Sequence, residues 1–310
     1  MAKVPGRVFH AVPGFEDHLL KELDSINESW GCLFHSLSLQ PVFWHRNVWL
    51  DPIKIEFTSI NEAVSTLRNL GRNWAPCLFT QFRRGSLISS KLPPLPIKKR
   101  PFPWLLPDTP MGAFTLLDAH TLIASTICSS PFPGGVIEFD EDKSGPPNRA
   151  YLKLWEALVL CRKWPQAGDL CLDAGASPGG WTWVLSKLGA KVIAVDRAPL
   201  DPKITAMQGI GFLKHDAFTL QPQDIGKIDW LFCDVICYPT RLYQWIEKWL
   251  ASGLCDNFIC SIKMQGTADN ADCRTVDFET ARRFAKIPDS RLIHLWHNKH
   301  ELTWIKTPLL

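Results

Sequence analysis

The sequence lacks long hydrophobic runs and paired-cysteine motifs. No apolar stretch approaches the roughly 18 residues that a membrane span needs, and the first residues show no hydrophobic signal-peptide segment. Ten cysteines are scattered along the chain, and no two of them form a C-x-x-C pair. This distribution favours free, mostly buried thiols in a reducing compartment over a disulfide framework or a zinc site. We therefore expect a cytoplasmic protein with no membrane partner and no bound metal.

Acidic residues are missing from one long stretch. Between Ala63 and Pro107 there is no Asp or Glu, although the formal net charge of the whole chain is only +3. Within it, residues 91–110 hold seven prolines, which exclude helix and sheet interior and predict an extended connector. The basic residues of this stretch are Arg68, Arg72, Arg83, Arg84, Lys91, Lys98, Lys99 and Arg100. It is either a solvated linker or a strip that contacts phosphates. Under the second interpretation three aromatic side chains are available to stack on bases: Phe82, Phe102 and Trp104.

The first 90 residues alternate strand-like and helix-like segments. An amphipathic pattern predicts a helix over 15–26, and Ser59 is expected to cap a second helix over 60–70. Strands are expected within 6–14, 41–50 and 53–57. We interpret residues 1–90 as a small α+β domain, followed by a connector with accessory strands over 91–147.

Residues 148–310 have an α/β pattern. Strands are expected at 169–175, 191–196, 211–216, 228–235, 258–263, 291–298 and 301–306, and helices at 149–164, 179–189, 240–253 and 278–286. Strands separated by helices indicate a parallel, doubly wound sheet, and the two closely spaced strands at the end indicate an antiparallel addition. The predicted fold class is therefore α/β, with a Rossmann-like, mostly parallel sheet whose last strand is antiparallel and a smaller N-terminal α+β domain.

The first loop of this second domain, "DAGASPGGW" (173–181), lacks the common nucleotide fingerprints. It has neither G-x-G-x-x-G nor the G-K-[S/T] ending of a phosphate loop. It still follows a strand and opens a helix, where backbone N–H groups attract a carboxylate or a phosphate. Asp196 stands 21 residues after Gly175, at the strand end where a carboxylate accepts from a ribose diol, and Asp216 is placed to accept from an adenine amine. These parts fit a nucleoside that carries a carboxylate, of which S-adenosylmethionine is the common one. The alternative is an ordinary α/β turn.

Four charged residues are expected to meet near this loop. Lys153 lies on the helix before the first strand, Asp234 ends the fourth strand, Lys263 ends the fifth and Glu301 opens the last. The carboxyl ends of parallel strands line one crevice, so Asp234 and Lys263 should converge beside the loop. Lys263 directly follows "FICSI", where an ammonium is costly unless it is paired or functional. Each residue alone suggests a salt bridge, but together with the loop the four predict an active site.

In these elements the sequence resembles the FtsJ-like ribose 2′-O-methyltransferases, whose signature is a Lys-Asp-Lys-Glu tetrad beside a D-x-G-x-x-P-G-G-W loop. The similar segments are 148–158, 173–181, 228–239, 258–266 and 295–306, with a shorter one at 12–23. The resemblance implies an S-adenosylmethionine-dependent methyltransferase domain over 148–310. Some members of the family methylate a cytidine ribose in 23S rRNA, and the resemblance implies the same class of substrate here. It implies that Lys263 is the proton acceptor, with Lys153, Asp234 and Glu301 beside it. It also implies cofactor contacts at Asp173, Gly175, Ser177, Pro178, Gly179, Gly180, Trp181, Asp196, Asp216 and Asp234.

The sequence departs from the family pattern in two places. Ala150 stands where the family tends to have a serine near the cofactor, so one hydrogen bond is missing. The region before the catalytic domain is too short for the family's full THUMP RNA-binding domain. We expect the basic stretch to contact rRNA in its place, either naked 23S rRNA or a pre-ribosomal particle, with Arg282 and Arg283 as the second candidate surface.

The expected chemistry is an in-line displacement at the sulfonium methyl by a ribose oxygen, without a metal. A lysine serves as the base only if its pKa falls, and we expect the Lys153 cation and burial to lower the pKa of Lys263 against the opposing effect of Asp234 and Glu301. Three alternatives stay open: a base-modifying RNA methyltransferase, a non-catalytic RNA-binding relative, and a protein or small-molecule methyltransferase. The first would typically carry an N/D-P-P-Y/F motif or a catalytic cysteine after the fourth strand, where this chain has only Cys237 and Pro239.

Overall fold

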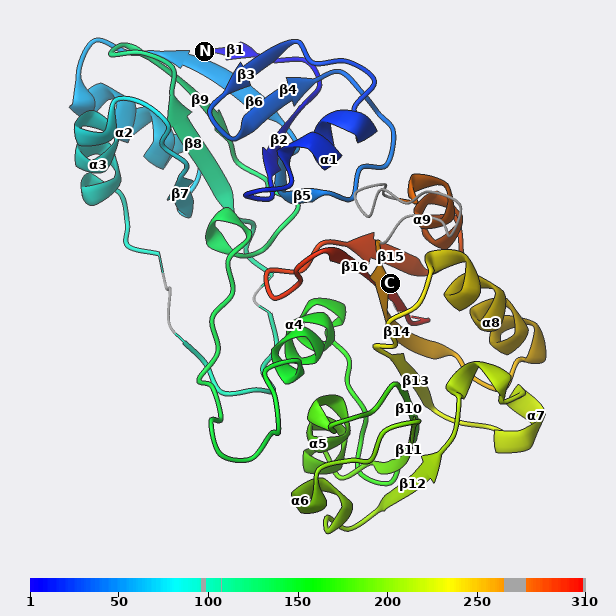
Figure 1. Cartoon of the computed structure of the whole chain (residues 1–310). Coiled ribbons are helices and arrows are strands. Elements are labelled where there is room, and N and C mark those ends of the chain that lie inside the picture. The colour runs from blue at the N-terminus through cyan, green and yellow to red at the C-terminus, as the bar shows by residue number, and fades with distance from the viewer. Residues whose placement is uncertain (96–98, 107, 265–276, 309–310) are drawn as a thin grey trace. The chain divides into compact units, whose positions relative to one another are not determined.

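The computed structural model describes residues 1–95, 99–106, 108–264 and 277–308, and it divides the chain into two compact units (Figure 1). Unit 1 comprises residues 1–100 and 106–138, and unit 2 comprises 101–105 and 139–310. The expected connector, 91–147, is therefore shared between the units. Lys98, Pro107 and Cys273 lie outside the described residues.

Unit 1 contains a five-stranded and a four-stranded sheet. The five-stranded sheet has the order β1-β6-β9-β8-β7, and all its neighbouring strands are antiparallel except β7 and β8, which are parallel. Its strands are β1 (Ala2–Lys3), β6 (Pro52–Glu56), β7 (Trp74–Pro76), β8 (Gly112–Leu116) and β9 (Thr121–Ser125). The antiparallel four-stranded sheet has the order β3-β4-β2-β5, built from β2 (Arg7–Ala11), β3 (Glu28–Trp30), β4 (Leu33–Ser36) and β5 (His45–Trp49). Strands β8 and β9 come from the expected connector, and both are interior strands of their sheet.

The helices of unit 1 are α1 (Glu16–Glu22), α2 (Ile60–Leu70) and α3 (Phe82–Lys91), with a 3-10 turn, η1 (Pro133–Gly135). Helix α2 confirms the predicted bounds and cap, because the Ser59 hydroxyl accepts from the Glu62 N–H at 3.2 Å. Its buried side chains, Ala63, Val64 and Leu67, pack into a core shared with the five-stranded sheet. The helix at the start of the basic stretch is thus a structural part of unit 1.

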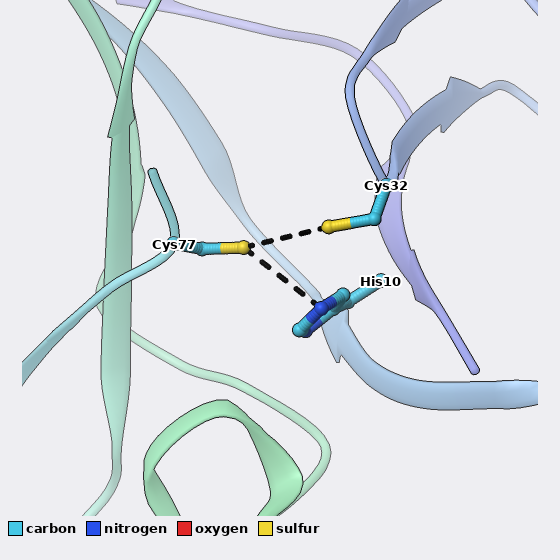
Figure 2. A group of neighbouring side chains, drawn as sticks. All are labelled: His10, Cys32 and Cys77. Atoms are coloured by element: carbon cyan, nitrogen blue, oxygen red, sulfur yellow. Dashed lines mark hydrogen bonds between the residues drawn. The ribbon is translucent and has the colours of Figure 1, made fainter. Parts of the chain in front are cut away.

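Unit 1 also brings together two thiols and an imidazole. The Cys32 and Cys77 sulfurs lie 4.0 Å apart, and the Cys77 sulfur lies 3.9 Å from His10 Nε2 (Figure 2). The nine described cysteines are all free thiols, as predicted, and six of them are buried: Cys128, Cys161, Cys171, Cys233, Cys255 and Cys260. Cys32, Cys77 and Cys237 are half-buried.

Unit 2 contains a seven-stranded sheet with the order β12-β11-β10-β13-β14-β16-β15. Its strands are β10 (Leu170–Ala174), β11 (Lys191–Asp196), β12 (Ile210–Lys214), β13 (Trp230–Cys233), β14 (Asn257–Lys263), β15 (Ser290–Ile293) and β16 (Glu301–Lys306). Strands β10 to β14 pair in parallel, whereas β16 is antiparallel to both of its neighbours. This confirms the predicted sheet and its antiparallel last strand. The strand order reverses between β10 and β13, which is where ligands bind in open α/β sheets.

The helices of unit 2 lie on both sides of the sheet, with α4, α5 and α6 on one side and α7, α8 and α9 on the other (Figure 1). They are α4 (Tyr151–Cys161), α5 (Gly180–Lys187), α6 (Pro202–Thr205), α7 (Pro222–Ile225), α8 (Pro239–Ser252) and α9 (Phe278–Ala285), with a 3-10 turn, η2 (Ala217–Thr219). No described helix combines the length and the hydrophobicity that crossing a bilayer requires.

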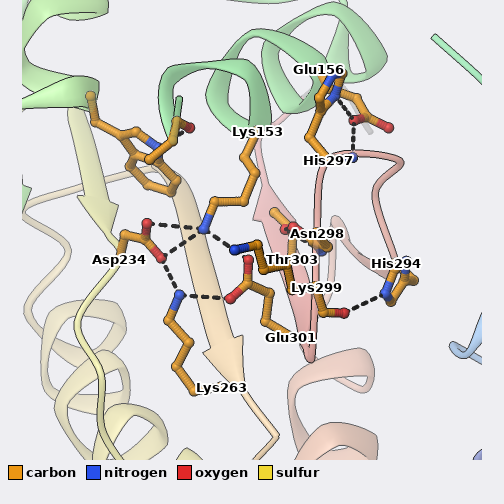
Figure 3. Close-up of polar contacts among 12 residues, drawn as sticks. Lys153, Glu156, Asp234, Lys263, His294, His297, Asn298, Lys299, Glu301 and Thr303 are labelled. Atoms are coloured by element: carbon orange, nitrogen blue, oxygen red, sulfur yellow. Dashed lines mark hydrogen bonds and ion pairs between the residues drawn. The ribbon is translucent and has the colours of Figure 1, made fainter. Parts of the chain in front are cut away.

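Helix α4 is buried on all sides and still carries two charged side chains, Lys153 and Glu156. The Glu156 carboxylate accepts from the backbone N–H groups of Trp296 and His297 at 2.7 and 3.0 Å and lies 2.7 Å from His297 Nδ1 (Figure 3). A buried carboxylate is tolerated when hydrogen bonds replace its water. Glu156 therefore fastens the segment that leads into β16 to helix α4.

We predict that Glu156→Gln lowers the free energy of unfolding by about 1–3 kcal/mol, because the two backbone N–H groups donate to different oxygens of Glu156 and the amide keeps only one of these acceptors. Urea unfolding followed by circular dichroism measures the change. Glu247→Gln is the control, since Glu247 forms only a half-exposed ion pair with Arg283 at 3.7 Å and its loss should cost under about 0.5 kcal/mol. Equal denaturation midpoints for Glu156→Gln and the parent would contradict the role given to Glu156.

Candidate active site

Lys153, Asp234, Lys263 and Glu301 form a closed ring of alternating charges (Figure 3). Lys153 Nζ lies 3.0 Å from Asp234 and 2.9 Å from Glu301, and Lys263 Nζ lies 2.6 and 2.8 Å from the same two carboxylates. Each ammonium thus bridges both carboxylates, and each carboxylate bridges both ammoniums. Burial of these charges is tolerable because the ring has no net charge and each group is hydrogen-bonded.

The sheet positions three of the four side chains. Asp234 directly follows β13, and its backbone N–H donates to the Ala174 carbonyl at 3.1 Å, which extends the parallel ladder by one residue. Lys263 and Glu301 face each other as register partners in the antiparallel pair β14–β16. Lys153 comes from the first turn of α4. The structure therefore brings together the four residues that the sequence singled out.

The ring keeps Lys263 protonated. Burial by itself lowers the pKa of Lys263, but the Asp234 and Glu301 carboxylates raise it well above its ordinary value. Burial likewise raises the pKa of Asp234 and of Glu301, but the two lysines hold both below their ordinary range. The expectation of a lowered Lys263 pKa is therefore wrong for the protein alone, because two contacting carboxylates outweigh desolvation and one neighbouring ammonium.

The loop after β10 depends on glycine for two close approaches. Gly175 has φ +79°, and a Cβ there would lie 2.7 Å from the Val235 side chain and 2.9 Å from its backbone nitrogen. At Gly180, the first residue of α5, a Cβ would lie 2.3 Å from Asn148 Oδ1. Gly179 has φ +115° and precedes the helix. The loop thus packs closely against the segments that follow β13 and precede α4.

Two carboxylates hold this loop from either side. Asp173, buried in β10, accepts from the Thr182 hydroxyl at 2.6 Å, and burial raises its pKa to about 7. Its other oxygen, Oδ1, is buried with no hydrogen-bond partner among the described residues. Asp196 ends β11 and accepts from the N–H groups of Ser177 and Ala198 at 3.0 and 2.8 Å. Asp196 is therefore tied to the loop and Asp173 to the first turn of α5, and Asp173 keeps one acceptor that no described residue uses.

A hollow of about 140 Å³ opens beside the loop, at the carboxyl ends of four neighbouring parallel strands. Its lining includes one residue from the end of each strand: Gly175, Asp196, Asp216 and Val235. The hollow therefore lies where the sheet order predicts a ligand.

Asp216 lies in this hollow but is already paired. Its Oδ2 accepts from Arg197 and, at 3.1 Å, from Arg241, and its Oδ1 accepts from the Phe218 N–H at 3.1 Å. Burial by itself raises the pKa of Asp216, but the hydrogen bonds from Arg197, Phe218 and Arg241 together outweigh burial and lower it. A carboxylate has about four acceptor positions, so an adenine amine has one position left to use.

Trp181 supports the loop from inside the unit. Its side chain is buried, its indole N–H donates to the Ala150 carbonyl at 2.9 Å, and it does not line the hollow. Trp181 therefore fixes the loop to the start of α4. Sequence reasoning missed four residues that support the site: Asn148, Glu156, Thr182 and Val235. Only Glu156 gave a signal, as a charge inside an apolar helix.

The basic stretch lies mainly in unit 1, and Phe102 and Trp104 fall in unit 2. Arg68, Arg72, Arg83, Lys91 and Lys99 are exposed. The Arg68 guanidinium donates to the Lys91 carbonyl, and Lys99 Nζ lies 3.9 Å from Glu138. Phe102, which was expected to be available to stack on a base, is half-buried, and its ring stacks on Trp155 with centroids 5.2 Å apart, so one of its faces is already occupied. Phe82, in contrast, is 61% exposed.

Known proteins resemble part of this chain. Residues 146–290 match the family described as FtsJ-like methyltransferase. The ribosomal RNA large subunit methyltransferase M of Azoarcus sp. (strain BH72) is 33% identical over 185 residues, which cover 56% of this chain and 49% of that protein. The protein of the same name from Thauera aminoaromatica is 33% identical over 171 residues, 52% of this chain and 46% of that protein. The chain thus spans about half the length of the curated relatives it matches.

A solved structure, the Methanococcus jannaschii fibrillarin pre-rRNA processing protein, aligns with 16% identity and a TM-score of 0.35 over 49% of this chain and 73% of that one, which is too distant to support a conclusion. The family match, in contrast, covers the loop after β10, Lys153, Asp234 and Lys263. Over residues 146–290, just under half of its length, the chain is therefore similar to the FtsJ-like methyltransferases.

Proposed function

We propose that this protein transfers a methyl group from S-adenosylmethionine to a ribose 2′-hydroxyl of large-subunit ribosomal RNA, at a cytidine of 23S rRNA. The observation that carries the proposal is the closed Lys153–Asp234–Lys263–Glu301 ring at the carboxyl edge of the sheet. The name of the curated relatives, ribosomal RNA large subunit methyltransferase M, supports the class of substrate. Either naked rRNA or a pre-ribosomal particle fits the proposal.

The cofactor is S-adenosylmethionine, and the residues beside the hollow fit it. Asp196 offers carboxylate oxygens to a ribose diol at a strand end, and the unpartnered Oδ1 of Asp173 offers a buried acceptor near the glycine loop. Trp181 stands where a phosphate loop has its lysine, which suits a ligand without phosphates. When bound, the cofactor supplies an electrophilic methyl group on a cationic sulfonium, whose charge disfavours the ammonium form of Lys263.

Lys263 is the proton acceptor in this proposal. A ribose hydroxyl is a poor nucleophile at neutral pH, so a positioned base must take its proton. The Lys263 side chain is 13% exposed and that of Lys153 is 9% exposed, so Lys263 is the more accessible lysine of the ring. Lys153 still bridges Asp234 and Glu301 when Lys263 loses its proton. Lys153 therefore acts as the positioning residue that holds both carboxylates in place.

The geometry disfavours a base-modifying enzyme with a catalytic cysteine. Cys237 follows β13 but is half-buried, and burial raises the pKa of its thiol to about 11. A nucleophilic cysteine needs a lowered pKa. The ring also disfavours a non-catalytic RNA-binding relative. A buried ion-pair network is often no more stable than apolar packing, so a protein that does not use these four charges for catalysis gains little stability from them.

We predict that Asp196→Ala weakens binding of S-adenosylmethionine by roughly 1–3 kcal/mol, as expected for the loss of hydrogen bonds to a charged group. Isothermal titration calorimetry measures the affinity. Asp224→Ala is the control, since that carboxylate caps α7 by accepting from the Gln221 N–H at 2.8 Å. An Asp196→Ala protein that binds as tightly as the parent would remove Asp196 from the cofactor site.

We predict that Lys263→Ala and Lys263→Arg each reduce methyl transfer by about 10²–10⁴-fold while cofactor affinity stays nearly unchanged. Arginine keeps the positive charge between Asp234 and Glu301 but cannot act as a base, so it separates catalysis from stability of the ring. Single-turnover assays on rRNA, with mass-spectrometric mapping of ribose methylation, give the rates. Transfer at the parent rate by Lys263→Arg would place the base elsewhere.

The same assignment fixes a pH dependence. Because the pKa of Lys263 lies above its ordinary value, only a small fraction is neutral near pH 7. The single-turnover rate of the parent should therefore rise with pH across the neutral and mildly alkaline range. A rate that is independent of pH there would make Lys263 a positioning residue.

We further propose that the exposed basic residues of unit 1 contact rRNA phosphates. The combined variant Arg83→Ala, Lys91→Ala and Lys99→Ala should weaken RNA binding. The slope of the logarithm of the binding constant against the logarithm of the salt concentration should become shallower by up to about 0.9 for each lost phosphate contact. Lys54→Ala, at an exposed lysine of β6 outside the stretch, is the control. Overlapping salt-titration curves for parent and variant would leave Arg282 and Arg283 of α9 as the next surface to test.

A further inference from the structure

We propose that His10, Cys32 and Cys77 form a binding site for a zinc ion in unit 1. Their ligand atoms, one imidazole nitrogen and two sulfurs, all lie within 4.8 Å of one another. It is the one group of at least three His, Cys, Asp or Glu side chains with this spacing in the described parts of the chain. The site is separate from the ring of unit 2, and the ion takes no part in methyl transfer.

The observed distances are close to those of a tetrahedral zinc site. With Zn–S bonds of about 2.3 Å and a Zn–N bond of about 2.0–2.1 Å, two sulfurs would lie about 3.8 Å apart and a sulfur and a nitrogen about 3.6 Å apart. The two sulfurs lie 4.0 Å apart, and the Cys77 sulfur lies 3.9 Å from His10 Nε2 (Figure 2). These two distances exceed the tetrahedral values by only about 0.2–0.3 Å, and the Cys32 sulfur lies within 4.8 Å of the His10 nitrogen, so small movements of the side chains would allow coordination of the ion.

The three ligands come from three segments of unit 1 whose backbones are held in place. His10 lies on β2 and pairs with Leu33 of β4, the residue after Cys32, and the Ala11 N–H donates to the Cys32 carbonyl at 2.9 Å. Cys77 follows β7, and its N–H donates to the Phe114 carbonyl of β8 at 2.9 Å. The site therefore joins the four-stranded sheet to the five-stranded sheet, and backbone hydrogen bonds hold its three segments in place.

Gly31 permits this approach. It has φ +60° in the turn between β3 and β4, and a Cβ there would lie 2.5 Å from Cβ of Phe79, two residues after Cys77. Only glycine lets the turn that carries Cys32 come this close to the segment that carries Cys77.

The chemistry of the surroundings suits a soft divalent cation. Thiolate and imidazole are the ligands that zinc prefers, and three protein ligands leave a fourth position for water. All three side chains are half-buried, so an ion can reach them, whereas six other described cysteines are buried. Cys32 and Cys77 pack, together with Val4, Trp30 and Leu117, against a cluster of buried apolar side chains.

Metal binding by the full chain tests the proposal. The protein is stripped with a chelator, reduced with a phosphine, and dialysed against Zn²⁺ or Co²⁺. We expect one zinc per chain by mass spectrometry of the metal, and a cobalt spectrum with thiolate charge-transfer and tetrahedral bands. Cys32→Ser, Cys77→Ser and His10→Gln should each weaken zinc binding by more than the roughly 10–100-fold that loss of an outer-shell partner costs. Cys237→Ser, which removes a half-buried thiol of unit 2, should bind as the parent does.

Thermal unfolding separates loss of metal binding from loss of folding, because each protein is compared with itself in the presence and absence of zinc. Zinc should raise the melting temperature of the parent and of Cys237→Ser but not of Cys32→Ser, since an ion that binds only the folded state stabilises it. Three results would overturn the proposal. The first is that the reduced parent binds less than one zinc per chain. The second is that Cys32→Ser binds zinc as tightly as the parent. The third is that the untreated protein contains a Cys32–Cys77 disulfide and, once reduced, binds no metal.

Discussion

The ammonium of Lys153 is the group on which the structure of unit 2 depends. It lies in a helix whose eleven residues are all buried, where an unpaired charge would be very costly. Two carboxylates reach it, one from the end of β13 and one from the start of β16, at 3.0 and 2.9 Å. A helix and two strands that are remote in sequence must therefore meet at one point. Displacement of any of them would leave a buried charge without its partner.

The position of β16 in the sheet follows from this requirement. Because β16 runs antiparallel between β14 and β15, its first residue, Glu301, faces the last residue of β14, Lys263. A parallel strand at that position would place its first residue at the opposite edge. Glu156 fixes the approach to β16 from the same helix that carries Lys153, by accepting two backbone N–H groups ahead of it. The ring and the fold of unit 2 thus stabilise each other.

Unit 1 assembles polar groups in a different way. In unit 2 the register of neighbouring strands brings the charged side chains together. In unit 1 two sheets contribute, and a glycine turn sets the distance between the segments that carry Cys32 and Cys77. No strand register links those two cysteines. Gly31 therefore allows the two cysteines to approach each other, whereas the antiparallel direction of β16 places Glu301 opposite Lys263 in the ring.

The sequence by itself determined the α/β order of unit 2, its antiparallel last strand, the cap at Ser59 and the identity of the four ring residues. These depend on local periodicity, on capping chemistry and on the rule that parallel strands end at one edge. Tertiary structure alone decided the protonation of Lys263, because the balance between burial and two contacting carboxylates is set by distances that no sequence spacing contains. It also decided that Phe102 stacks on Trp155 and that β8 and β9 complete the sheet of unit 1. His10, Cys32 and Cys77 are 22 and 45 residues apart, so their meeting depends on long-range packing that cysteine spacing cannot reveal.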